Sequence, residues 1–262
     1  MSLSAEDIER FVQDGYVRVS DAFSQDVAAQ CRGIIDEAAG VRWNEPSTWR
    51  EPVVRLGHFS DPPFLDAANT PILREACTQL VGRDRWAPLS ALGTFVLRFP
   101  VPGSINDDGW HIDVSFAGPD SVPDDYMTWR ANVWSRDRGL LMLFLLTDIE
   151  ETDGPTRLRV GSHLSMARRL QPAGDAGLSL AQLAEQGFDD TAECLEVLAT
   201  GKAGTVYLCH PFVVHAAQRN IGKHARYLAQ PSLSLRQQLS LHRADGIYTP
   251  VERAIRLGLG SR

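Results

Sequence analysis

Hydrophobic positions recur at helical spacing in the first third of the chain and at strand spacing after it. Apolar side chains three or four positions apart predict helices over residues 5–13, 24–39 and 71–82. A short alternating stretch, 16–20, predicts a strand between the first two helices. Residues 41–70 show no clear period, so we expect a long loop or an insertion on the substrate side.

Short alternating stretches separated by turns dominate from about residue 89. The expected strands run over 92–99, 109–116, 131–135, 139–148, 157–160, 205–217 and 225–235. Between and after them we expect a turn over 161–163, a mobile loop over 117–130, an inserted helix over 178–186 and a final helix over 249–258, which opens with a capping box of Thr249 and Glu252. Many short strands with few helices favour a β-sandwich or jelly roll. We expect a single domain over 1–262, with helical decoration in 1–88, a core over about 89–236 and the last helix.

The composition is that of a globular protein with a sizeable core. Apolar residues make up 44% and charged residues 23% of the 262 positions, which disfavours bulk disorder. The formal charge of −7 argues against nucleic acid or an anionic membrane as a partner, because both require a basic face. The first residues lack a secretory pattern and the longest apolar run, 140–146, is too short for a bilayer, so we expect a cytoplasmic protein. The oligomeric state stays open.

The stretch GWHIDVSF, residues 109–116, places His111 and Asp113 two positions apart on a predicted strand. Residues at this spacing share a face, so the pair is either the polar outer face of a half-buried sheet or two ligands of one metal ion. A third ligand would have to come from another part of the chain. The candidates are His58, His163, His210, His215, His224 and His242.

His215 is favoured because Arg226 follows it by eleven positions, beyond a turn. In a simple hairpin the two residues would face each other, whereas in a jelly roll their strands can lie in facing sheets. In either arrangement the long arginine side chain reaches the pocket beside His215. His210 lies in the same predicted strand but points to the other side if the strand is regular.

Two imidazoles and one carboxylate, with the remaining positions open, form the ligand set of non-haem Fe(II) oxygenases. No cysteine pair has CxxC spacing, which disfavours structural zinc. A neighbouring arginine offers a rigid fork that binds a dicarboxylate through two parallel hydrogen bonds. The residues themselves therefore favour an iron site with an anionic cosubstrate.

In these features the chain resembles the phytanoyl-CoA dioxygenase family of Fe(II)/2-oxoglutarate oxygenases. Beyond the histidines and Arg226, the resemblance covers roughly residues 5–235. Its segments are HID at 111–113, ERFVQDGYVRVSDAFS at 9–24, TDIEETDGPTRLRVGSHL at 147–164 and GTVYLCHPFVVHAAQRN at 204–220. An HxD pair alone is weak evidence, but this ordered combination is specific.

The resemblance implies a mainly β fold with flanking helices, a double-stranded β-helix of the cupin-like jelly-roll type. His111, Asp113 and His215 would bind Fe(II) and form the catalytic centre. Arg226 would hold the distal carboxylate of 2-oxoglutarate, which O2 converts to succinate and CO2 while a C–H bond of a small organic molecule is hydroxylated. Halogenases of the wider superfamily replace the carboxylate by a small residue, so the presence of Asp113 disfavours halogenation.

The resemblance also places further side chains near the pocket. In the alternating stretch 92–99, Arg98 points to the face opposite Phe95 and Leu97. Arg98 and Thr156 are expected at the cosubstrate, although Arg98 also fits a solvated strand arginine. The residues expected near the substrate are Trp110, Trp129, Arg157 and His210. Their alternative roles are packing for the tryptophans and His210, and surface solvation for Arg157.

Several outcomes of the chemistry remain open at this point. The same cofactors support epimerisation, desaturation or ring closure, because the pose of the substrate decides where its radical reacts. A non-catalytic ligand- or metal-binding protein on the same scaffold is a second alternative. A non-redox Zn or Mn hydrolase or isomerase of the cupin type is a third. By family analogy, the substrate is expected in secondary metabolism.

Overall fold

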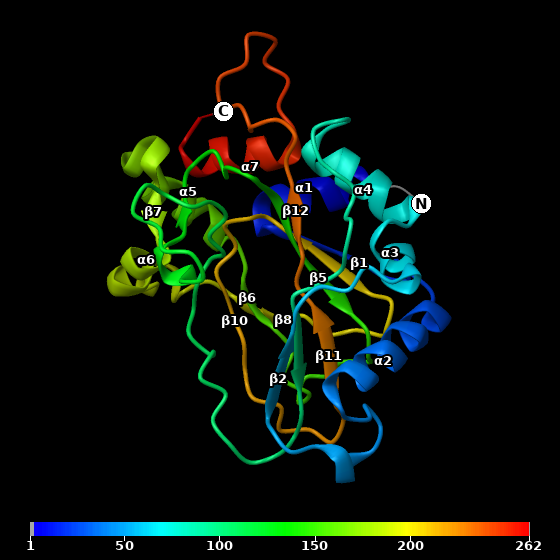
Figure 1. Cartoon of the computed structure of the whole chain (residues 1–262). Coiled ribbons are helices and arrows are strands. Elements are labelled where there is room, and N and C mark those ends of the chain that lie inside the picture. The colour runs from blue at the N-terminus through cyan, green and yellow to red at the C-terminus, as the bar shows by residue number, and fades with distance from the viewer. Residues whose placement is uncertain (1–2, 262) are drawn as a thin grey trace.

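The computed structural model describes residues 3–261 as two β-sheets that face each other within a shell of helices (Figure 1). The large sheet has the order β1 (Tyr16–Val19), β9 (Val206–Cys209), β5 (Arg138–Leu145), β11 (Arg226–Ala229), β3 (Phe95–Arg98) and β2 (Val53–Leu56), and β12 (Ser232–Ser234) also pairs with β5. The small sheet has the order β10 (His215–Ala216), β6 (Arg157–Arg159) and β8 (Glu196–Leu198). A separate pair joins β4 (Arg130–Ala131) to β7 (Leu178–Ser179).

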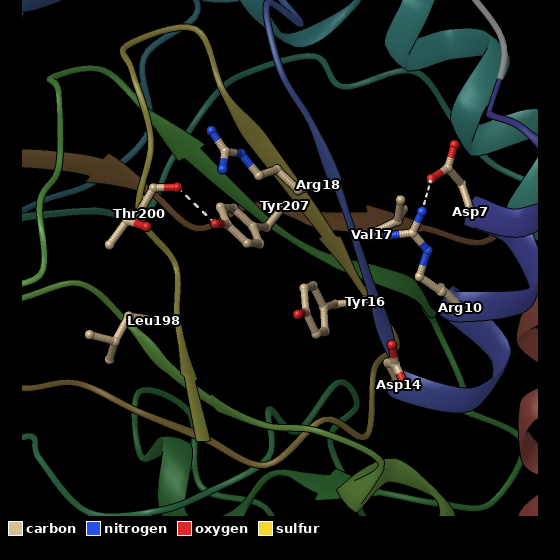
Figure 2. Close-up of a pocket in the computed structure, with 9 residues that line it drawn as sticks. All are labelled: Asp7, Arg10, Asp14, Tyr16, Val17, Arg18, Leu198, Thr200 and Tyr207. Atoms are coloured by element: carbon tan, nitrogen blue, oxygen red, sulfur yellow. Dashed lines mark hydrogen bonds and ion pairs between the residues drawn. The ribbon is translucent and has the colours of Figure 1, made fainter. Parts of the chain in front are cut away.

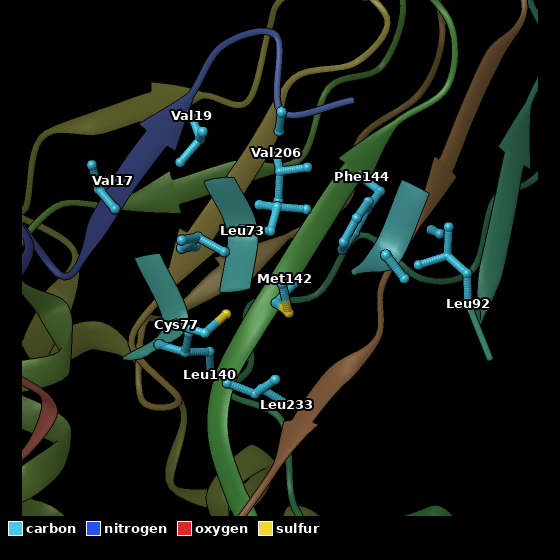
Figure 3. Close-up of a cluster of buried hydrophobic side chains, with 14 of the residues drawn as sticks. Val17, Val19, Leu73, Cys77, Leu92, Leu140, Met142, Phe144, Val206 and Leu233 are labelled. Carbon is cyan, nitrogen blue, oxygen red and sulfur yellow. The ribbon is translucent and has the colours of Figure 1, made fainter. Parts of the chain in front are cut away.

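The large sheet buries both of its faces, and β5 shows this most clearly because all of its residues are buried. Leu140, Met142 and Phe144 belong to the main hydrophobic cluster, which Figure 3 shows together with Leu73 and Cys77 of the fourth helix. The alternate residues, 141, 143 and 145, pack with Leu158 of the small sheet. Strand periodicity therefore separates a helix-covered outer face from an inner face between the sheets.

Helices cover the outer face and the two ends of this arrangement. They are α1 (Ala5–Asp14), α2 (Gln25–Ala39), α3 (Pro62–Ala68), α4 (Pro71–Val81), α5 (Ser162–Leu170), α6 (Leu180–Gln186) and α7 (Pro250–Gly258), with short 3-10 helices η1 (Pro46–Thr48), η2 (Tyr126–Thr128), η3 (Gln171–Ala176) and η4 (Asp189–Thr191). The predicted helices α1, α2, α4 and α7 are confirmed, and their side-chain caps are Ser4, Ser24, Thr70 and Thr249. No helix within 3–261 has the length and hydropathy needed to cross a bilayer.

The last helix is tied to the body of the protein through Glu252. This fully buried carboxylate accepts hydrogen bonds from the backbone N–H groups of Ser240 and Thr249 and pairs with Arg85 at 2.7 Å. A buried charge is tolerated when every partner is in place, and here the partners come from three separate segments. The capping box that the sequence predicted at Thr249 therefore also fixes where α7 lies.

Three expected segments differ from the structure. Residues 41–70 are not one loop but contain η1, β2 and α3, because β2 hydrogen-bonds to β3 and gains order from a distant partner. The stretch 109–116 is not a regular strand; it is extended and carries isolated bridges at His111 and Phe116. The stretch after Gly161 is not only a turn, because the glycine takes a left-handed conformation with φ of 76° and α5 begins directly after it.

The two strands expected last are each divided. Residues 205–217 form β9 and β10, which belong to different sheets, and the break falls around Pro211. Residues 225–235 form β11 and β12, with Pro231 between them. Proline lacks the N–H that a strand interior needs, which explains both breaks. The strand expected over 131–135 is reduced to the end of β4, and β8 was not expected. The predicted fold class, a mainly β jelly roll with flanking helices, is confirmed.

Candidate metal centre

His111 and His215 are brought together by backbone pairing between two segments that lie about a hundred positions apart. The N–H of His111 donates to the carbonyl of His215 at 3.0 Å, and the reverse bond measures 2.9 Å. The two ring centroids are 4.3 Å apart. With Asp113 they form a group whose ligand atoms all lie within 4.8 Å of one another. The predicted triad therefore converges on a point that one metal ion can occupy.

The orientation of both imidazoles suits a metal ligand. Nδ1 of His111 lies 2.9 Å from the carbonyl of Gly109, and Nδ1 of His215 lies 3.0 Å from that of Val213. Ligating histidines usually donate their second ring N–H in this way, which leaves Nε2 for the ion. Burial, reinforced by the neighbouring His111, lowers the pKa of His215 to about 4. The ring is thus neutral at physiological pH, the form that binds a metal.

Asp113 is oriented by Arg138, the first residue of β5. Its Oδ2 accepts a hydrogen bond from Nη1 of Arg138 at 2.5 Å, while Oδ1 lies 3.7 Å from Nε2 of His215. Nη2 of Arg138 also donates to the carbonyl of Val114. Burial alone would raise the pKa of Asp113, but the guanidinium and the two histidines outweigh it and hold that pKa below its ordinary value. The carboxylate is therefore ionised, with Oδ1 directed at the histidines.

Arg138 was not predicted as a site residue. The available signal was its position, because it directly precedes the continuous apolar run that became the doubly buried β5. A charged residue at the start of such a strand is only 9% exposed here and needs a partner. Asp113 is that partner.

Arg98 and Arg226 lie on the inner face of the large sheet, opposite each other on β3 and β11. Nη2 of Arg226 donates to Oγ1 of Thr156 at 2.9 Å. Within 3–261, Nε and Nη1 of both arginines are buried without a hydrogen-bond partner. Burial, with the nearby charge of Arg98, lowers the pKa of Arg226 to about 9, so the group stays charged at neutral pH. Such a pair of unsatisfied cations fits an incoming carboxylate.

Asp107 is the carboxylate nearest to this pair, and the sequence did not single it out. Its Oδ2 accepts a hydrogen bond from Nη2 of Arg98 at 2.7 Å, and Arg55 of β2 binds the same oxygen. We call Arg55, Arg98, Arg226 and Asp107 the arginine cluster. It holds three guanidinium groups against one carboxylate.

The metal ligands open into a cavity of about 470 Å3. His111, Asp113 and Arg138 form one side of it, and Arg55 and Tyr126 contribute from other elements. His215 and Arg226 lie deeper, nearly enclosed between the sheets. Arg226, which the resemblance places at the distal carboxylate of 2-oxoglutarate, thus lies on the enclosed side of the ligand residues, and the cavity lies on their open side.

The residues predicted near the substrate are not among those that line this cavity. Trp110 packs against two guanidiniums, with Arg159 3.9 Å and Arg157 4.5 Å from its ring centre. His210 is fully buried beside His163. The main chain of Trp129 accepts a hydrogen bond at the start of α6. Substrate contact by any of them stays a prediction.

A second cavity, of about 390 Å3, lies beside α1 and β1 (Figure 2). Tyr16 and Tyr207 stack at its centre with ring centroids 6.1 Å apart, and Arg10 pairs with Asp7 at its edge. It contains none of the metal ligands and none of the other predicted site residues. This cavity therefore takes no part in the candidate metal centre.

Solved structures with the same fold include one enzyme that is described as alpha-ketoglutarate dependent and two complexes that contain 2-oxoglutarate. The carbocyclase SnoK from nogalamycin biosynthesis, described as non-heme and alpha-ketoglutarate dependent, matches at 16% identity and a TM-score of 0.54, over 89% of this chain and 84% of its own. EctD from S. alaskensis with 2-oxoglutarate and 5-hydroxyectoine matches at 21% identity and 0.53, over 89% and 76%. HygX from Streptomyces hygroscopicus with nickel, 2-oxoglutarate and hygromycin B matches at 15% and 0.55, over 88% and 87%.

These structural matches show the fold, whereas the sequence itself shows the family. No curated protein matches the chain. The profile of the phytanoyl-CoA dioxygenase (PhyH) family matches residues 11–227, which include all three metal-ligand candidates and Arg226. By that match, and in keeping with the geometry of its histidines and aspartate, this chain belongs to the phytanoyl-CoA dioxygenase family.

Proposed function

We propose that this protein is an Fe(II)/2-oxoglutarate-dependent dioxygenase that hydroxylates a C–H bond of a small organic molecule. The observation that carries the proposal is the convergence of His111, Asp113 and His215 at the floor of a cavity. Two imidazoles and one carboxylate leave half of an octahedral ion free, as an Fe(II) oxygenase requires. Family membership and the cosubstrate-bound EctD and HygX structures support the same cofactors here.

The chain's own residues have separate roles in this proposal. His111, Asp113 and His215 bind the ion, and Arg138 keeps the carboxylate ionised and turned toward it. Arg226 binds the distal carboxylate of 2-oxoglutarate, with Thr156 and Arg98 beside it. Bound Fe(II) and 2-oxoglutarate, with O2, supply the oxidising power and release succinate and CO2. The apolar side chains between the sheets keep water away from the buried end of the site.

The first test measures 2-oxoglutarate turnover without any added substrate. The metal-free protein is supplied with Fe(II), ascorbate and 2-oxoglutarate in air, and succinate is quantified. We expect slow succinate formation that depends on both iron and oxygen. If succinate does not form, and 2-oxoglutarate also fails to bind the Mn(II)-loaded protein under nitrogen, the proposal is wrong.

The outcome of the oxidation is a separate part of the proposal. Mass spectrometry of a converted substrate distinguishes the alternatives, because hydroxylation adds an oxygen atom, desaturation or ring closure removes two hydrogens, and epimerisation leaves the mass unchanged. The likeness to the carbocyclase SnoK makes ring closure the second candidate. A non-catalytic binding protein would bind 2-oxoglutarate but form no succinate.

A further inference from the structure

The arginine cluster keeps a positive charge that the metal centre and the cosubstrate do not neutralise. Arg138 is matched by Asp113, and Asp107 is shared between Arg98 and Arg55. The distal carboxylate of 2-oxoglutarate would match Arg226, so the three guanidiniums of the cluster would face two carboxylates. One cation remains, in a chain whose overall charge is −7.

The position of Arg55 shows where this remaining charge acts. Arg98 and Arg226 are almost completely buried, whereas half of the Arg55 side chain is exposed. Arg55 opposes Val96 in the β2–β3 register, so both point from the inner face into the cavity that the metal ligands line. Its bond to Asp107 uses Nη2 and fixes the side chain in this direction.

The rest of the cavity wall is made of hydrogen-bonding groups. Thr94, Gln230 and Ser232 line it from the large sheet, and His58 and Tyr126 from the surrounding loops. Val96 is the single aliphatic side chain among its lining residues within 3–261. A long hydrocarbon chain would leave these polar groups without partners, which costs about 1–3 kcal/mol for each one buried. A small polar molecule would satisfy them.

We propose that the substrate is a small polar organic anion and that Arg55 binds its carboxylate or phosphate group above the metal ion. This inference rests on the proposed function. An oxyanion matches the guanidinium fork of Arg55 and supplies the negative charge that the loaded site lacks. The cavity volume of about 470 Å3 suits a molecule of low molecular mass.

The experiment measures how close small probe molecules bind to the metal ion. Mn(II)-loaded protein is saturated with 2-oxoglutarate under nitrogen, so that Arg226 is occupied. Paramagnetic relaxation by Mn(II) is then measured for 19F of trifluoroacetate and of its neutral partner trifluoroacetamide. The same comparison uses 31P of inorganic phosphate and of neutral trimethyl phosphate. We expect saturable relaxation of the two anions and none of the neutral probes. The anion that binds with the higher affinity identifies the anionic group of the substrate as a carboxylate or a phosphate.

Variants assign this binding to one side chain. In Arg55→Gln the dissociation constant of the preferred anion should rise about tenfold or more, and Arg55→Lys should recover part of the loss. Arg55→Gln leaves Asp107 paired with Arg98, so the fold retains its buried ion pair. Arg50→Gln is the matched control, since Arg50 is exposed, carries the same charge and donates to the carbonyls of Ser47 and Trp49.

Three results would overturn the inference: equal relaxation of charged and neutral probes, no saturable relaxation of either anion, or unchanged anion affinity in Arg55→Gln. Failure of the proposed function gives a different result, because the protons of 2-oxoglutarate would then show no relaxation by bound Mn(II). In that case the anion measurements, repeated without 2-oxoglutarate, still decide whether Arg55 binds an oxyanion near the metal ligands.

Discussion

The protein contains two pairs of neighbouring histidines, and the surroundings of the two pairs differ. The rings of His111 and His215 are 4.3 Å apart at the floor of the cavity, and those of His163 and His210 are 4.9 Å apart beneath helices α1 and α7. Burial lowers the pKa of both His163 and His215 to about 4, so in each pair a neutral imidazole is favoured. The ring distance therefore does not distinguish the two pairs.

The difference lies in what the ring nitrogens face. In the cavity pair each Nδ1 meets a carbonyl two residues earlier, and each Nε2 is left for Asp113 and the space beside it. In the other pair Nε2 of His163 lies 3.1 Å from the carbonyl of Val12, and Nδ1 of His210 accepts from the N–H of Phe212.

The helix-covered pair also has no room for an ion. A side chain at Gly15, whose φ is 88°, would place its Cβ 2.5 Å from Nδ1 of His163. Within 3–261 no acidic or cysteine side chain joins this pair in a group of three ligands. The cavity pair differs because a backbone carbonyl binds Nδ1 of each imidazole and a carboxylate lies close to both Nε2 atoms.

The largest effect is expected from removing that carboxylate. Asp113→Ala should reduce succinate formation to the background without protein, because two imidazoles alone hold Fe(II) poorly and the ligand set is incomplete. Co(II) binding, followed by absorption, should weaken together with activity. Circular dichroism checks the fold, since Arg138 loses its partner. Asp120→Ala, at an exposed aspartate with the same charge, is the control. Retained activity in Asp113→Ala would remove the distinction between the two pairs.

Acid should destabilise the protein through the helix-covered pair. The unfolded chain protonates His163 near its ordinary pKa of 6.5, whereas burial lowers the folded pKa to about 4. Between these values the unfolded state binds more protons, so the free energy of unfolding falls as the pH drops from 6.5 to 4. The loss from this residue is about 3 kcal/mol, and His210, whose pKa is also lowered by burial, adds to it.

Urea unfolding at several pH values between 7.5 and 4.5 measures this effect. The metal ligands His111 and His215 also bind protons when the chain unfolds, so the same series with His163→Gln gives the share of His163 as the difference between the two pH dependences. An unfolding free energy that does not fall from pH 6.5 to pH 5 would show that His163 and His210 are readily protonated in the folded protein.

A smaller change is expected when the support of Asp113 is removed. Arg138→Gln leaves Oδ2 of Asp113 without its ionic partner, so the carboxylate is no longer held with Oδ1 toward the histidines. Co(II) affinity should fall about 10- to 100-fold, the usual range for partners of metal ligands. The Co(II) affinity of Arg138→Lys should lie between those of Arg138→Gln and the wild type. Arg136→Gln, two residues away and exposed, should change the affinity less than about twofold. Equal affinities in the variants at 136 and 138 would contradict this role.

The smallest effect is expected at Trp110, directly before the first ligand. Trp110→Phe weakens the contacts with Arg157 and Arg159 and should cost about 1 kcal/mol or less in unfolding free energy. The metal affinity should stay within about twofold, because the backbone bonds between His111 and His215 are unchanged. Thermal unfolding and Co(II) titration measure the two quantities. A large loss of Co(II) affinity with unchanged stability would instead place Trp110 within the metal site.

The sequence predicted those parts of the protein whose signals are local or carried by an ordered motif. Capped amphipathic helices such as α1 and α7 were found from Ser4 and Thr249. The ordered combination of His111, Asp113, His215 and Arg226, with the family resemblance, predicted the three ligand residues that lie together in the structure. The alternating pattern of β3 also placed Arg98 on the face opposite Phe95 and Leu97, as the structure has it.

What the sequence missed depends on pairing between distant segments. Strand β2 has no clear period of its own and forms against β3, so residues 41–70 were predicted as a loop. Arg138 and Asp107 act through partners 25 and 9 residues away in sequence, and no local pattern marks such pairs. The sequence also left open whether His215 and Arg226 lie in a hairpin or in facing sheets. They lie in different sheets, because β10 pairs with β6 and β11 pairs with β3.

Strand β2 occupies the outer edge of the large sheet and pairs with β3 alone. Its residues can therefore be exchanged without altering the strands that carry the metal ligands or Arg226. If Arg55 binds the substrate as proposed, replacing positions 53–56 with other sequences of the same strand pattern would vary which molecules are accepted, and Asp107 would keep its bond to Arg98. Selection for a new substrate, in the laboratory or in evolution, would therefore be expected to act first on substitutions in this edge strand.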